Sequence, residues 1–134
     1  MNFMFLAMTL ILTLSPSMSY PSETTWVSGA DDVGNTLKEG QTLYEAGNMQ
    51  GAKGKVTDAY FEVFEGKGIE AAVRRFISLR KATELEKGFA DIRKAIHGGV
   101  PAGKIKEQTL SLIEALKSAA NELDRKGVGM DVSY

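Results

Sequence analysis

The sequence predicts an all-α protein: an up-and-down four-helix bundle preceded by a signal peptide. Apolar side chains recur every three or four residues in four segments of the 134-residue chain, the spacing of a buried helix face. Short connections containing glycine or proline separate the segments, and no stretch alternates apolar and polar residues as a strand would. Amphipathic helices joined by short loops pack as antiparallel neighbours, so a bundle is the expected architecture.

The first nineteen residues are typical of a secretory signal peptide. Residues 3–14 read FMFLAMTLILTL, and no charged side chain precedes Glu23. Ser17 and Ser19 provide a small-x-small cleavage site just before Tyr20. The apolar run is shorter than the ~20 residues of a permanent transmembrane helix. We therefore expect a periplasmic or secreted protein with no stable membrane span after signal removal; an uncleaved membrane anchor is the alternative.

Composition excludes several classes of function. The formal net charge of −1 offers no basic excess for a phosphate backbone, so no nucleic-acid partner is expected. The chain has no cysteine, which excludes disulfides, thiolate metal sites and covalent c-type haem. An exported domain without disulfides fits a bacterial periplasm, and its stability must come from packing alone.

A turn-rich leader over residues 20–29 precedes the helical bundle, which is expected to span residues 30–127. The first helix is expected from about Ser28, whose hydroxyl can cap its first turn, to a C′ glycine at Gly47. Trp26, ahead of this helix, is expected to pack as a lid over the end of the bundle. The apolar stripe of the first helix consists of Ala30, Val33, Leu37, Gly40 and Tyr44.

A second helix is expected over residues 49–65, with Asn48 as its cap. Gly51 and Gly54 weaken its first turns, where it either frays or approaches another helix closely. Its polar side carries Lys55, Asp58, Glu62 and Glu65, and its buried face consists of Val56, Ala59, Tyr60, Val63 and Phe64.

A third, long helix is expected from Ile69 to about Ile96, after a tight turn at residues 66–68. The apolar stripes of its two halves join imperfectly near Ser78, where the helix can bend. The first half carries Ile69, Val73, Phe76 and Ile77, and the second carries Ala82, Leu85, Phe89, Ile92 and Ile96.

The fourth helix is expected after Pro101, a residue favoured in the first helical turn, and ends at Gly127. Residues 128–134 are expected to form a flexible tail. The stripe of the fourth helix consists of Ile105, Thr109, Leu112, Ile113, Leu116, Ala119, Ala120 and Leu123.

The runs DAYFEVFEGKGIEAAVRRF (residues 58–76) and LRKATELEKGFADIRKAIHGG (residues 79–99) resemble the extracytoplasmic N-terminal domain of bacterial high-affinity iron permeases. The likeness covers roughly residues 37–123. Members of that family continue into transmembrane helices with an Arg-Glu-x-x-Glu iron motif, and this chain contains neither. The features that carry the resemblance are Tyr60-Phe61, Phe64-Glu65, Gly68-Ile69-Glu70, and Leu85-Glu86 with Phe89.

The resemblance implies a non-enzymatic periplasmic domain that assists iron uptake, by binding the metal or by docking to an inner-membrane iron transport component. The alternative is a structural or protein-interaction bundle with no metal role. A haem-binding bundle ranks below both, since His97 is the only histidine. Whether Tyr134 is the natural end or marks a truncated permease stays open.

Glu62, Glu65 and Glu70 are the candidate metal ligands. Glu62 and Glu65 are three residues apart on one expected helix, so their carboxylates can converge, and Glu70 begins the next helix across the turn. Oxygen donors suit iron(III), and with His97 nearby they could suit iron(II). The competing interpretation is a solvated acidic face on which Glu70 stabilises a helix N-terminus and pairs with Arg74.

Enzymatic chemistry is not indicated. Glu84 and Glu86 are two residues apart on a helix and point in opposite directions, so they cannot share an ion. The Glu-x-x-His spacing of di-iron bundles is absent, and the lone His97 has neither a nucleophile motif nor an acidic orienting group. Residues 51–55 are glycine-rich but lack the spacing of a phosphate-binding loop.

Overall fold

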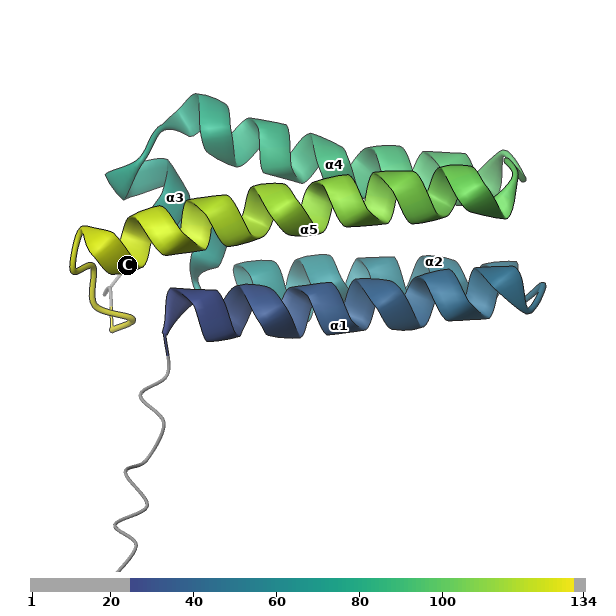
Figure 1. Ribbon diagram of the computed structural model, residues 1–134, viewed down its shortest axis with the longest axis horizontal. Helices are drawn as coiled ribbons and strands as arrows, with labels where there is room; N and C mark the ends of the chain where they lie inside the picture. The colour runs from purple at the N-terminus through teal and green to yellow at the C-terminus, as the bar shows by residue number, and fades with distance from the viewer. Residues whose placement is uncertain (1–24, 132–134) are drawn as a thin grey trace, which may run out of the picture.

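The computed structural model describes residues 25–131, and within them the chain is all-helical with no strand (Figure 1). The all-α prediction is therefore confirmed. The expected signal peptide, residues 1–19, and the last three residues of the tail lie outside the described range. The helices are α1 (Trp26–Glu45), α2 (Met49–Asp58), η1 (Ala59–Glu65), α3 (Ile69–Phe76), α4 (Leu79–His97) and α5 (Ala102–Arg125).

The long helices are arranged in two layers, α1 with α2 and α4 with α5 (Figure 1). α1 packs against both α2 and α5, and α4 packs against both α5 and α2. Successive long helices run in opposite directions, and the short α3 connects the two layers at one end (Figure 1). Among residues 25–131, no helix has the length and hydropathy needed to cross a membrane.

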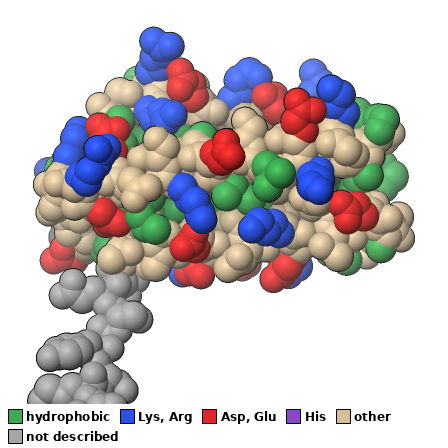
Figure 2. Space-filling view, in the orientation of Figure 1, with side chains coloured by type: hydrophobic (Ala, Val, Ile, Leu, Met, Phe, Trp, Pro, Cys, Tyr) green, Lys and Arg blue, Asp and Glu red, His purple; other side chains and the backbone are tan. Residues whose placement is uncertain are grey.

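The surface carries both signs of charge. On the face shown in Figure 2, Lys and Arg side chains alternate with Asp and Glu side chains and do not gather by sign.

α1 begins at Trp26, two residues earlier than the expected start at Ser28, because Thr25 is its N-cap. Thr25 Oγ1 accepts a hydrogen bond from Ser28 N at 3.1 Å, and Ser28 Oγ accepts one from Thr25 N at 3.0 Å. This reciprocal pair is a capping box in which serine takes the place of the usual glutamate. Trp26 is thus the first helical residue and is fully buried in the core, not a lid ahead of the helix.

The two ends of the described chain meet at one end of the molecule. The Asp124 carboxylate accepts hydrogen bonds from Trp26 N and Val27 N at 3.0 and 3.1 Å. It therefore satisfies free amides of α1 and places negative charge at the positive end of the helix dipole. Val128, in the expected tail, accepts a 2.7 Å hydrogen bond from Trp26 Nε1 through its carbonyl, and Met130 also packs against the core.

Most positions of the predicted stripes form the core; the exceptions, which are only partly buried against it, are Tyr44, Tyr60, Val63, Phe76 and Ile77. Every stripe position of α5 is buried, including the polar Thr109, and so is every stripe position of α4. The aromatic part of the core joins η1 to α4, with the rings of Phe64 and Phe89 5.1 Å apart. In α1 the stripe is buried from Ala30 to Gly40.

The expected long third helix is two helices, α3 and α4. The helix is interrupted at Ile77 and Ser78. Ser78 has an extended backbone, and its Oγ accepts a 3.0 Å hydrogen bond from Lys81 N. The serine thereby caps a new helix, and the bend expected at this position is a complete break. Gly68, which precedes α3, has φ +78°, a backbone conformation that favours glycine.

The expected second helix changes type at Ala59, where α2 passes into the π-helix η1. Hydrogen bonds in a π-helix span five residues, and Gly66 N donates to Phe61 O at 3.1 Å. A Cβ atom on Gly66 would overlap the Glu62 carbonyl oxygen and lie 2.9 Å from its carbon, so the glycine permits this wide turn to close. The side chains after the first π turn consequently point in directions that differ from those they would take in a continuous α-helix.

Candidate functional site

The charges of acidic side chains from three helical segments act on the phenol of Tyr60. Glu65 belongs to η1, Glu70 to α3 and Glu86 to α4, and the charge of each acts on Tyr60. Arg74 of α3 donates hydrogen bonds to Glu70 and Glu86. These five residues are called the Tyr60 cluster below.

The π-helix brings Tyr60 and Glu65 onto one face. They are five residues apart, a spacing that places two side chains on different sides of an α-helix but stacks them in a π-helix. Burial, the charges of Glu65 and Glu86, and hydrogen bonding to Glu65 raise the pKa of Tyr60 from 10.0 to about 12. The phenol therefore stays protonated at pH values at which an ordinary tyrosine is ionised.

An aromatic group fixes the Tyr60 ring. Phe61 meets it edge-on at a centroid distance of 4.8 Å, Phe89 meets it edge-on at 5.3 Å, and Phe64 packs against it at 5.8 Å. Phe64 and Phe89 are fully buried, whereas Phe61 is largely exposed. The phenol therefore has a defined position at the edge of the core.

Arg74 links two carboxylates that would otherwise repel each other. Its Nη2 contacts Glu70 one turn earlier on α3 and donates to Glu86 Oε1 of α4 at 3.1 Å. The Glu70 and Glu86 side chains are 17% and 29% exposed, whereas that of Arg74 is 50% exposed. Burial, hydrogen bonding to Glu86 and the charges of Glu86 and Glu65 raise the pKa of Glu70, against the opposing effect of Arg74.

The predicted ligands divide into two groups in the structure. Glu65 and Glu70 both belong to the Tyr60 cluster. Glu62 is exposed and lies apart from this cluster. Glu39, which pairs with Lys55 at 2.7 Å, is the main cause of the raised pKa of Lys55, and the charge of Glu62 adds the smallest contribution. The convergence of Glu62 with Glu65 was expected from α-helical spacing, and η1 does not have that spacing.

Neither Tyr60 nor Glu86 stands out as a site residue in the sequence. The apolar spacing places Tyr60 on the expected buried face of its helix. Glu86 is two residues from Glu84, and the two side chains are expected to point in opposite directions. The divergence is real, since Glu84 pairs with Arg80 at 3.0 Å and Glu86 with Arg74. The signal that could have found both residues is the resemblance itself, because the aromatic pair at Tyr60 and the Leu-Glu at Glu86 are among its features.

The donor set of the Tyr60 cluster suits a hard cation. Carboxylate oxygens bind hard metal ions, and a phenolate oxygen is a known ligand of iron. Across residues 25–131, no three His, Cys, Asp or Glu side chains lie close enough together to hold an ion as they stand. Arg74 supplies the positive charge between Glu70 and Glu86, so a cation would have to take its place.

His97 is exposed at the last position of α4, at the C-terminal turn where it was expected.

Comparison of the chain with protein-family models, with curated proteins and with solved structures finds no match.

Proposed function

We propose that this protein is a non-enzymatic periplasmic domain that assists iron uptake, and that it binds the metal at the Tyr60 cluster. The observation that carries the proposal is that Arg74 joins the carboxylates of Glu70 and Glu86, whose charges, with that of Glu65, act on one phenol. These residues lie within the segments that resemble the extracytoplasmic domain of iron permeases. Iron is the cargo of such a domain, so the site has to release the metal as well as bind it.

The ion replaces Arg74 in this proposal. The Arg74 side chain is half exposed, so its guanidinium can move into solvent when it gives up its hydrogen bonds to Glu70 and Glu86. Glu70 and Glu86 then turn toward the ion, whose charge favours their ionised forms and that of Tyr60. Because metal binding releases these protons, binding weakens as the pH falls.

The proposed location and partner of the protein come from its sequence pattern and from the resemblance to iron permeases. A signal peptide at residues 1–19 directs the chain out of the cytoplasm, and an inner-membrane iron transport component is the proposed partner. The helices form an up-and-down four-helix bundle in which α2 and η1 count as one rod and α3 connects the two layers.

Calorimetric titration of the purified protein tests the proposal, with iron(III) supplied as its nitrilotriacetate complex in air and iron(II) added under anaerobic conditions. We expect one ion to bind with a Kd below about 1 mM. The double variant Glu65→Gln/Glu70→Gln should lose at least tenfold in affinity. The matched control Glu62→Gln, which removes an exposed carboxylate of the same segment, should bind as wild type. Equal isotherms for all three proteins would exclude the Tyr60 cluster as the site.

The second candidate function is a structural or protein-interaction role, and the hydrogen bonds of Arg74 favour it, since they tie α3 to α4. Arg74→Gln separates the two functions. If the cluster binds iron, removal of the competing cation should tighten binding severalfold. If Arg74 serves only as a link, the variant should lose stability and bind no metal.

A further inference from the structure

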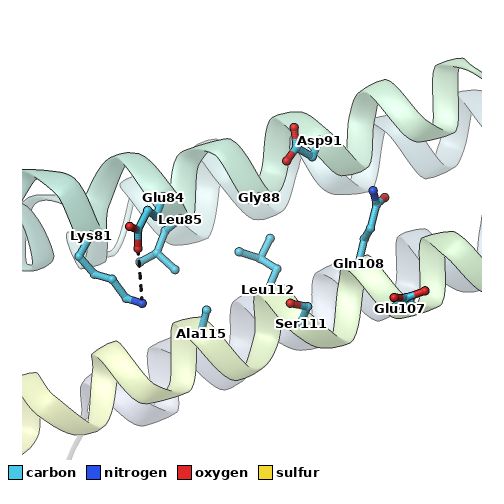
Figure 3. Close-up of a pocket in the computed structure, with 10 residues that line it drawn as sticks. All are labelled: Lys81, Glu84, Leu85, Gly88, Asp91, Glu107, Gln108, Ser111, Leu112 and Ala115. Atoms are coloured by element: carbon cyan, nitrogen blue, oxygen red, sulfur yellow. Dashed lines mark ion pairs between the residues drawn. The ribbon is translucent and has the colours of Figure 1, made fainter.

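No further inference is drawn: the strongest candidate, the hollow of about 310 Å³ between α4 and α5 (Figure 3), offers no free polar group to a ligand, because its buried acceptor, Gln108 Oε1, is closed to solvent and each carboxylate on its rim already pairs with a lysine or an arginine.

Discussion

Arg74 of α3 donates a hydrogen bond to Glu86 of α4 at 3.1 Å while it also contacts Glu70 on its own helix. One guanidinium thus joins two helices that the sequence pattern predicts to be one, across the break at Ser78. It also sits between two carboxylates of the Tyr60 cluster, the position that the proposed function assigns to a metal ion. The pairing therefore bears on both the stability of the domain and its proposed activity.

Replacement of Glu70 by glutamine should change how stability depends on pH. The pKa of Glu70 is raised above its usual 4.5 in the folded state, so its contribution is fully present below that value and is lost as the pH rises through the raised pKa. Glu70→Gln does not titrate, so its stability relative to wild type should be greater near pH 7 than near pH 4. Urea denaturation at the two pH values measures this difference. A difference that does not vary with pH would show that Glu70 ionises as freely as in the unfolded chain.

The phenol of Tyr60 should ionise at a higher pH than that of an ordinary tyrosine. Burial and the neighbouring carboxylates raise its pKa to about 12, so the stability linked to its neutral phenol is fully present below about pH 10 and is lost between pH 10 and 12. Ultraviolet absorbance of phenolate during alkaline titration should show a late step that is missing in Tyr60→Phe. Identical titration curves for the two proteins would contradict the described environment of the phenol.

Gly66 should be essential to the π-helix. A Cβ atom there would overlap backbone atoms of Glu62, so Gly66→Ala should destabilise the protein by about 1–3 kcal/mol. Gly54→Ala is the matched control, because no atom lies within 4 Å of the position its Cβ would take, and it should stabilise α2 by up to about 1 kcal/mol. Urea denaturation of both variants tests the contrast. Similar effects of the two substitutions would mean that the turn at Gly66 can accommodate a side chain.

Asp124 should contribute to stability as a cap supplied from another helix. Its carboxylate accepts from Trp26 N and Val27 N, so Asp124→Ala leaves two amides of α1 without a partner and should cost about 1–2 kcal/mol. Glu114→Ala, an exposed acid on the same helix, should change the unfolding free energy by less than about 0.5 kcal/mol. Chemical denaturation compares the two, and an equal effect would contradict the capping role.

Helix content and the core were predictable from the sequence because both follow from apolar spacing. The stripe from Ile105 to Leu123 is buried as the spacing predicts, and so is the stripe from Ala82 to Ile96. The start of α1 was less predictable, since both Thr25 and Ser28 can cap a helix. The structure uses Thr25 as the N-cap and Ser28 as its partner in the capping box.

The Tyr60 cluster was only half predictable, because it depends on a change of helix type. Residues 59–65 satisfy an α-helical pattern equally well, and the wider turn arises where Gly66 permits it. Glu65 and Glu70 could be selected from their residue type and their position around the turn. Glu86 is distant in sequence, and nothing in its local spacing indicates that Arg74 reaches it from another helix.

Anomalous X-ray diffraction at the iron absorption edge, from crystals of the protein soaked with iron(III), tests the central claim most directly. We expect a peak within coordination distance of the Glu65, Glu70 and Glu86 carboxylates, with the Arg74 side chain displaced into solvent. An absence of iron at the Tyr60 cluster, with Arg74 still bound to Glu70 and Glu86, would contradict the account.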